Sequence, residues 1–213
     1  SAGCSTSQLR NWIITGTSVG IRNKRAHGKP TVAISDGDDL LKWRLVTINE
    51  PADVDVWGES AVMLDGRRVI NIARFGKSDA RALVAFSEDY GRTWTPSLPG
   101  NLPMATSKPC AGTLSTGQRF LVCTTTADSG HRRSPLTIAV GRPGENGFRK
   151  ILRIRDAEHA GSGESHPKAK LSYPCAVEHD GRLYVGFSNS GPRGGNRNSA
   201  ELAVIPIEKL RVD

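Results

Sequence analysis

The chain has 213 residues, which suits one domain with its own core, and 37% of them are hydrophobic and 23% charged, as in globular rather than disordered proteins. No apolar run approaches the roughly 20 residues that a membrane span needs, and no basic-apolar-small leader opens the chain, so we expect no membrane partner. The net charge is +8, but lysine and arginine are scattered without an aromatic-interleaved stripe, so an anionic ligand or a solvated basic surface is expected rather than a nucleic acid.

The first fifth of the chain resembles an incomplete copy of a unit that recurs later. Residues 11–17 and 31–35 are apolar enough to be strands, and residues 35–43 form a Ser-Asp-Gly turn ending in Trp43. A strand before these would have to lie in residues 1–6, which is short. We therefore expect the chain to start inside a repeat, and we count about four units in all.

The later units repeat with a period of about 51 to 64 residues. Each begins with a segment of small and apolar residues, continues through a turn and an apolar strand, and ends with a further strand. The three initial segments are 56–61, 107–112 and 172–177, and the three turns are Asp65-Gly66, Thr116-Gly117 and Asp180-Gly181. A period of this length suits a four-stranded antiparallel sheet repeated around an axis, and no segment predicts a helix longer than a turn or two.

Residues 87–94 read Ser-Glu-Asp-Tyr-Gly-Arg-Thr-Trp. The apolar run 82–86 before them predicts a strand. Asp89 can bond its own backbone and Gly91 allows a positive φ, so the two predict a turn. Trp94 begins the return and can lie over the hairpin. The pattern Ser-x-Asp-x-Gly-x-Thr-Trp predicts a folding element rather than a catalytic one.

The four cysteines do not form a CxxC pair, so we expect no zinc site, and no metal or other cofactor is implied. A two-residue turn at Thr116-Gly117 would place Cys110 opposite Cys123. A cross-strand disulfide is one outcome there, but such bridges are often strained, and two reduced, packed thiols are favoured.

The eight-residue motif and the repeat resemble the Asp box and the blades of the sialidase-like (neuraminidase, BNR repeat) β-propeller family. The resemblance implies an all-β fold of four-stranded antiparallel blades, of which about four are visible, corresponding to the C-terminal part of a six-bladed propeller. The blades would be residues 1–55, 56–106, 107–170 and 171–213. An open propeller of this kind is expected to associate with itself or with missing N-terminal blades.

Glu59 and Arg74 form the first candidate site pair. The segment from Gly58 to Arg74 is similar to the family's Glu…Asp-Gly-Arg…Arg segment. If Asp65-Gly66 is a two-residue turn, Glu59 pairs with Ile72, and Arg74 leaves the same face of the sheet two residues later. The alternative is a structural ion pair.

Arg133 precedes the strand predicted at 136–140, where the family places an arginine. Resemblance implies that Arg74 and Arg133 are two of three arginines that hold the substrate carboxylate, a task that suits the planar guanidinium fork. Arg132 is a rival for this role, and two unrelated surface arginines are the alternative.

Tyr173 matches the family's catalytic tyrosine, with Glu59 as the base that activates it. Sialic acid carries a carboxylate beside its anomeric carbon, which would repel a carboxylate nucleophile, whereas a neutral phenol avoids this repulsion. In the repeat, Trp57 and Lys108 occupy the positions equivalent to Tyr173, so all three are expected to line a common pocket. A tyrosine packed for structure is the alternative.

The resemblance implies a secreted or periplasmic glycosidase that removes a sialic-acid-like sugar from an anionic glycan. The family's first arginine and its acid/base aspartate have no match in this sequence. Two other functions therefore stay open: a non-catalytic module that binds anionic glycans, and a polysaccharide lyase that uses a histidine or tyrosine as base.

Overall fold

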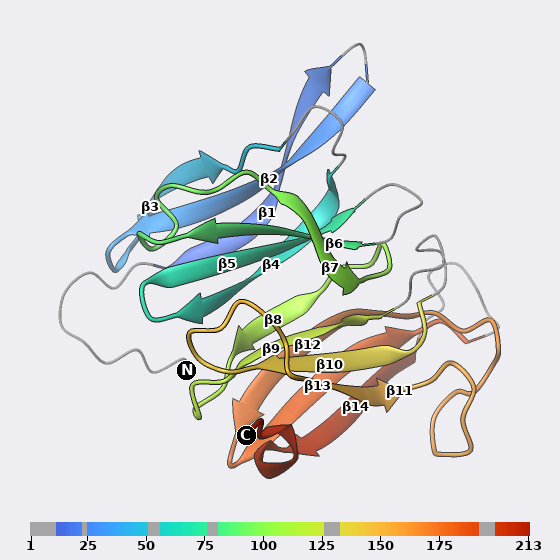
Figure 1. Ribbon diagram of the computed structural model, residues 1–213. Coiled ribbons are helices and arrows are strands. Elements are labelled where there is room, and N and C mark those ends of the chain that lie inside the picture. The colour runs from blue at the N-terminus through green and yellow to red at the C-terminus, as the bar shows by residue number, and fades with distance from the viewer. Residues whose placement is uncertain (1–11, 23–24, 51–55, 76–80, 126–132, 192–198) are drawn as a thin grey trace.

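The computed structural model describes residues 12–22, 25–50, 56–75, 81–125, 133–191 and 199–213, and these form antiparallel strands and one short 3-10 helix. The predicted strand at residues 1–6 lies outside the described residues. The all-β architecture expected from the sequence is confirmed, with the strands arranged in successive sheets of three or four (Figure 1).

The first sheet contains β1, β2 and β3, and the second contains β4 to β7. Only one residue pair, Gly28 with Val56, joins them in the described residues, so we treat them as two sheets. Their bounds are β1 (Ile13–Arg22), β2 (Arg25–Asp36), β3 (Asp39–Thr47), β4 (Val56–Asp65), β5 (Arg68–Phe75), β6 (Arg81–Ser87) and β7 (Leu98–Pro103).

The third sheet has the order β11-β10-β9-β8 and the fourth has the order β12-β13-β14. The 3-10 helix η1 follows the last strand. The bounds are β8 (Cys110–Thr113), β9 (Arg119–Thr124), β10 (Leu136–Gly141), β11 (Lys150–Arg155), β12 (Leu171–His179), β13 (Arg182–Asn189), β14 (Ser199–Pro206) and η1 (Ile207–Leu210).

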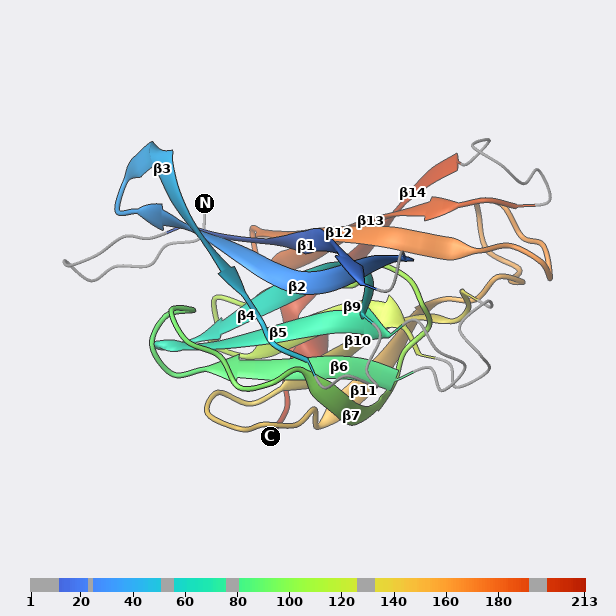
Figure 2. The same cartoon turned by 90° about the horizontal axis from the view of Figure 1, so that it is seen from above.

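The first strands of consecutive sheets lie against one another: β1 against β4, β4 against β8, and β8 against β12. The first two sheets fill the upper half of Figure 1 and the other two the lower half, and Figure 2 shows them from above. Because the first strands are neighbours and run from corresponding positions of the repeat, their starting ends gather at one end of the molecule. This is the arrangement of propeller blades around an axis.

Among the described residues, three apolar cores fill the spaces between the sheets. Val32 and Ile34 of β2 meet Ala85 of β6 in the first. The second joins the second and third sheets around Met63 and Leu121. The third joins the third and fourth sheets in a cluster of Phe120, Val122, Ile138, Leu183, Val185 and Phe187. Strands β9 and β10 are buried on both faces because a sheet lies on each side, which explains their unbroken apolar sequences.

Two of the predicted hairpin registers are wrong, because the turns lie at other residues than expected. In the second sheet Asp65 pairs with Arg68, so the turn is Gly66-Arg67 rather than Asp65-Gly66. The predicted pairing of Glu59 with Ile72 is therefore wrong, since Ala61 takes that place. The turn at Asp180-Gly181 is confirmed, because His179 pairs with Arg182 and both turn residues have positive φ.

The predicted pairing of Cys110 with Cys123 is also wrong, because Cys110 lies opposite Val122. The two thiols consequently belong to different cores, Cys110 to the one beside the fourth sheet and Cys123 to the one beside the second. Both are free, as is Cys175. Burial raises the pKa of the Cys123 thiol to about 11, so this packed thiol stays protonated at neutral pH.

The Asp box at residues 87–94 closes the turn after β6 with a network of side-chain bonds. Asp89 accepts from Thr93 N at 2.8 Å, from Thr93 Oγ1 at 2.7 Å and from Ser87 Oγ at 2.8 Å. Gly91 has a φ of 85°, and a Cβ there would touch Ile13 and Ile34 of the first sheet. The Trp94 indole donates to the Gly91 carbonyl at 2.8 Å. The box therefore holds its own turn and packs it against the neighbouring blade.

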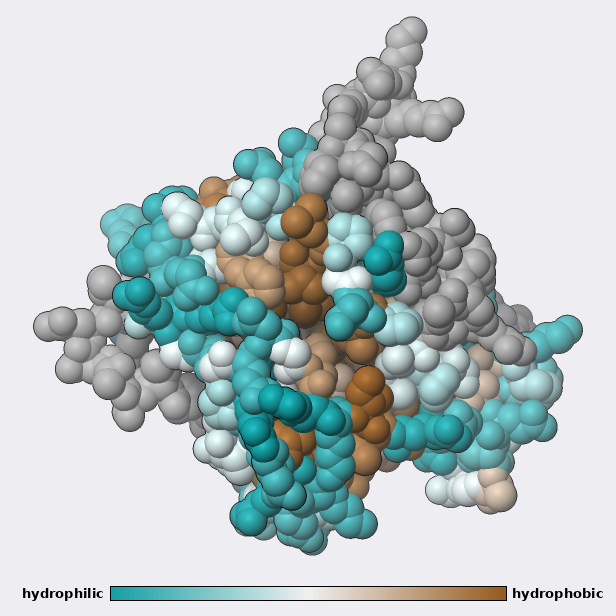
Figure 3. Space-filling model, viewed as in Figure 1, coloured by the Kyte–Doolittle hydropathy of each residue, from teal (hydrophilic) through white to brown (hydrophobic). Residues whose placement is uncertain are grey.

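The outward faces of the first and last sheets are apolar and exposed. Leu45 of β3 is 71% exposed and Leu202 of β14 is 61% exposed. A band of apolar side chains also runs down the centre of the face in Figure 3, between hydrophilic flanks. Self-association stays a prediction. In the described part of the chain, no helix is long and apolar enough to cross a membrane.

Asp89 makes the Asp box sensitive to acid. Burial raises the pKa of its carboxyl, but hydrogen bonds from Thr93, Ser87 and the Arg92 backbone outweigh burial and lower the pKa to about 2. The unfolded carboxyl has a pKa of about 3.9, so the stabilisation is complete above that pH and is lost as the pH falls towards 2. We expect Asp89→Asn to lower the melting temperature at pH 7 and to flatten its decline between pH 5 and pH 2.

Asp38→Asn is the matched control, because Asp38 is an exposed residue of the turn between β2 and β3. Circular dichroism melts at several pH values would measure both variants. An Asp89→Asn variant as acid-sensitive as the unmodified chain would contradict the assignment.

Candidate functional site

Four of the sequence-predicted residues come from three sheets and gather at the end where the first strands begin. Glu59 lies early in β4, Arg74 late in β5, Arg133 just before β10, and Tyr173 early in β12. Glu59, Arg74 and Tyr173 lie on strands that pack in the interblade cores, and Arg133 lies in the segment that leads into β10. Residues more than 100 positions apart are thus brought together by the sheets.

Glu59 and Arg74 form an ion pair. Arg74 Nη2 lies 3.4 Å from Glu59 Oε2, and the arginine side chain is only 9% exposed while that of the glutamate is 46% exposed. The ladder between β4 and β5 is irregular between Val56 and Ser60, and this irregularity lies beside Glu59. The expected proximity of carboxylate and guanidinium is therefore observed, although the register that predicted it was different.

Arg74 and Arg133 share one hydrogen-bond acceptor. Arg74 Nη1 donates to the carbonyl oxygen of Thr106 at 3.3 Å, and Arg133 Nη2 donates to the same oxygen at 3.2 Å. Because both guanidinium groups bond to the same oxygen, they lie close together. Two cations at this separation repel each other, so an anion placed between them is stabilised.

Tyr173 lies against Arg133. The Arg133 guanidinium carbon is 5.3 Å from the centre of the Tyr173 ring, a cation–π contact, and Tyr173 is 45% exposed to solvent. The Arg133 backbone carbonyl also accepts a hydrogen bond from Leu171 N at 2.8 Å, which ties this segment to the start of β12. Arginine and tyrosine are thus held together by backbone as well as side chain.

The backbone of Tyr173 is strained. Its φ is 53°, a left-handed conformation that few residues other than glycine adopt, and the β12–β13 ladder is interrupted between Ser172 and Cys175. Pro174 has no N–H to donate, so the interruption sacrifices no ladder bond there. The bulge turns the tyrosine out of the sheet and towards solvent.

The other expected site residues are less closely placed. Lys108 is exposed two positions before β8, and none of its observed contacts reaches the four residues. The backbone of Trp57 lies in β4, but its side chain falls outside the described residues, as does Arg132. The pocket shared by Trp57, Lys108 and Tyr173 stays a prediction.

Thr106 was missed by the sequence reasoning. It contributes its backbone carbonyl, which every residue has, so its side chain gave no signal. Its position just before the repeat segment 107–112 is the feature that could have identified it. Ser107, next to it, is buried with a hydroxyl that has no hydrogen-bond partner among the described residues.

His159 does not join the arginines of the site. Its ring nitrogens lie 3.4 Å from Arg155 Nη1 and 3.2 Å from the Glu164 carbonyl oxygen, within the loop between β11 and β12. A lyase mechanism would need a base beside Arg74 and Arg133, so His159 gives it no support.

The blade arrangement and the Asp box define a β-propeller of the sialidase-like type. The chain belongs to the BNR repeat-like domain family, whose profile matches residues 11–185. No protein with curated annotation matches the sequence.

Solved structures share the fold. A protein of unknown function from Dyadobacter fermentans has 19% identity and a TM-score of 0.69, and the match covers 92% of this chain and 50% of that one. The K499G mutant of NanB sialidase from Streptococcus pneumoniae has 16% identity and a TM-score of 0.64, covering 98% of this chain and 31% of that one. The exo-β-1,3-galactanase 1,3Gal43A from Clostridium thermocellum has 15% identity and a TM-score of 0.65, covering 93% and 44%.

This chain therefore spans half or less of the length of these structures. The likeness shows a scaffold that glycoside hydrolases also use.

The different burial of Glu59 and Arg74 predicts unequal effects on stability. Arg74→Gln leaves buried polar groups without their partner and should lower the free energy of unfolding by about 1–3 kcal/mol. Glu59→Gln removes a half-exposed carboxylate and should cost less than about 1 kcal/mol. Urea unfolding of both variants would measure this. A Glu59→Gln cost equal to or above that of Arg74→Gln would contradict the observed burial.

Proposed function

We propose that this chain carries the site of a glycoside hydrolase that acts on a sialic-acid-like sugar with a carboxylate. The supporting observation is that Arg74 and Arg133 meet at the Thr106 carbonyl beside the exposed Tyr173. Two guanidinium groups suit a carboxylate, which can accept a planar, bidentate pair of hydrogen bonds from each. The sugar's anomeric carbon, next to its carboxylate, would then lie near the phenol.

In this proposal Arg74 and Arg133 bind and orient the carboxylate, and Tyr173 is the nucleophile. The phenol oxygen forms a bond to the anomeric carbon as the glycosidic bond breaks, and the phenolic proton passes to Glu59. The departing sugar oxygen takes a proton from an acid. Water then releases the sugar from the tyrosine.

Glu59 is suited to its role by its ion pair. Arg74 holds the Glu59 carboxylate in place at 3.4 Å and keeps it at the same end of the blades as Tyr173. A base that is already positioned spends no further conformational entropy during the reaction.

The second candidate is a module that binds an anionic glycan without cleaving it. One feature of the sequence favours it: no residue matches the family's acid/base aspartate, which would protonate the leaving group. The arginine pair would serve such a module unchanged. Turnover and binding therefore have to be measured separately.

Arg74→Ala tests the carboxylate site. We expect binding of N-acetylneuraminic acid to weaken by about 2–5 kcal/mol, because the variant removes one partner of a buried, charge-assisted contact. Isothermal titration calorimetry would measure it, with Arg211→Ala, an exposed arginine, as control. Circular dichroism would verify folding. Unchanged binding in the Arg74→Ala variant would refute the carboxylate site.

Tyr173→Phe tests the nucleophile. We expect turnover of a fluorogenic sialoside to be lost while binding of N-acetylneuraminic acid stays nearly intact, because the phenol oxygen acts in the reaction rather than in binding. Tyr184→Phe, on β13 of the same sheet, is the matched control. If the unmodified chain binds the sugar without cleaving it, the binding-module function replaces the hydrolase.

A further inference from the structure

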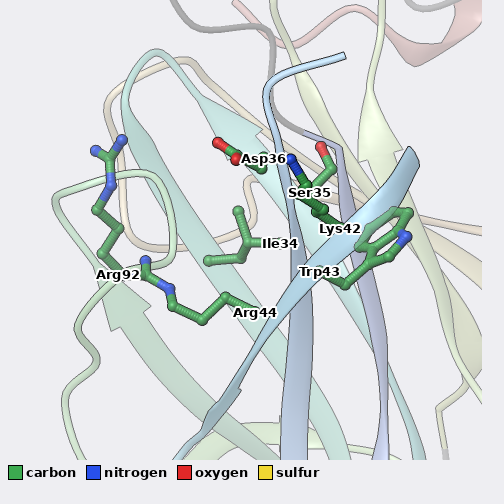
Figure 4. A pocket seen from close by; sticks show the side chains of 7 residues that line it. All are labelled: Ile34, Ser35, Asp36, Lys42, Trp43, Arg44 and Arg92. Carbon is green, nitrogen blue, oxygen red and sulfur yellow. The ribbon is translucent and has the colours of Figure 1, made fainter. Parts of the chain in front are cut away.

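A hollow lies at the Asp-box end of the blades, away from Tyr173. It has a volume of about 380 Å³ and is lined by Ile34, Ser35, Asp36, Lys42, Trp43, Arg44 and Arg92 (Figure 4). This volume falls within the range of small-ligand sites. Its walls come from the hairpin of β2 and β3 and from the Asp box of the second sheet.

The hollow is remote from Tyr173 and its neighbours. Gly28 of β2 pairs with Val56, close to Glu59, whereas Asp36 is at the far end of the same strand. At about 3.3 Å per residue, positions 28 and 36 are roughly 26 Å apart. A sugar held by Arg74 and Arg133 cannot reach it.

Arg44 and Arg92 border the hollow from two different sheets. Arg44 lies opposite Ile34 on the β2–β3 ladder, so it shares the face that packs towards the Asp box. Ile34 is buried and forms an apolar floor, and the two arginine side chains lie on one side of it in Figure 4. Trp43, the next residue along β3, points to the other side of the strand.

Neither guanidinium has an ion-pair or hydrogen-bond partner within the described ranges of the chain. Lys42 differs, since its ammonium lies 3.4 Å from Asp39 Oδ2. Arg92 occupies a variable position of the Asp box, whose hydrogen bonds use Ser87, Asp89, Thr93 and Trp94 side chains. Folding of the turn therefore does not need the Arg92 side chain.

Asp36 adds an acceptor to the same hollow. Its carboxylate also lacks a partner among the residues that the structure describes, and it faces the space between the arginines and Ile34. A simple dianion would gain from the arginines but be repelled by Asp36. A hydroxylated ligand with one anionic group could satisfy all three side chains, because its hydroxyls can donate to the carboxylate.

We propose that this hollow is a second, non-catalytic binding site for a saccharide unit that carries one oxyanion, either a sulfate ester or a carboxylate. The oxyanion lies between Arg44 and Arg92, a ring hydroxyl donates to Asp36, and the sugar's apolar side rests on Ile34. The site would hold an anionic glycan at the opposite end of the blades from Tyr173.

Calorimetric titration with galactose 6-sulfate and with galacturonic acid tests the proposal, and the two probes distinguish the sulfate from the carboxylate source. Binding of either probe supports it where the arginine variant weakens that binding, because galacturonic acid could also bind at Arg74 and Arg133. Binding that the variant leaves unchanged would overturn the proposal. The paired variant Arg44→Gln with Arg92→Gln should weaken that binding by roughly tenfold or more, since two charge-assisted contacts are removed. Arg182→Gln, an exposed arginine on β13, is the matched control and should leave binding unchanged.

Asp36→Asn distinguishes a site for a sugar from a place that binds an adventitious ion only. The variant should weaken the sugar several-fold and should strengthen inorganic sulfate, because it removes a hydroxyl acceptor and a repulsive charge. Either of two further results would also overturn the proposal: neither probe binds, or inorganic sulfate binds as well as the sugars in the unmodified chain. Melting temperatures of all variants establish that they fold.

Discussion

The carbonyl oxygen of Thr106 accepts hydrogen bonds from two guanidinium groups that belong to different sheets, and the site depends on this shared acceptor. Bringing two arginines together costs electrostatic energy, which Glu59 offsets for Arg74 alone. The remaining positive charge lies beside Tyr173. The blades provide the rigidity that keeps these charges from separating, because Glu59, Arg74 and Tyr173 leave strands that pack in interblade cores and Arg133 leads directly into another.

Most of the fold could be predicted because a blade repeats its own local signals: turn residues, apolar strands and one well-formed Asp box. Two of the three hairpin registers could not, since a turn such as Asp65-Gly66-Arg67 offers two positions for the same loop. The two register errors had different consequences. The shift at Glu59 preserved its side of the sheet, so its proximity to Arg74 survived, whereas the one-residue shift at Cys110 moved it to the face opposite Cys123.

The candidate site also contains residues that the sequence could identify and others that it could not. Glu59, Arg74, Arg133 and Tyr173 were identified as candidates because the segments around them resemble those of the family, and their roles stay predictions. Thr106 was not, because it acts through its backbone. The hollow at the Asp-box end was not predictable either: Arg44 and Arg92 are ordinary surface residues in the sequence, and only the packing of one blade's hairpin on the next blade's Asp box makes them neighbours.

Both ends of the blades hold a left-handed residue other than glycine, but in different settings. At the Asp-box end Tyr90 (φ 60°) precedes Gly91 in a turn that the side chains of Ser87, Asp89 and Thr93 hydrogen-bond. At the other end, Tyr173 keeps a left-handed backbone that costs of order 1–3 kcal/mol. The pairing of β12 with β13 on either side of the bulge and the contact with Arg133 stabilise this conformation. A relaxed β12 would return the tyrosine to the sheet, so the strain itself is what presents the phenol beside the arginines.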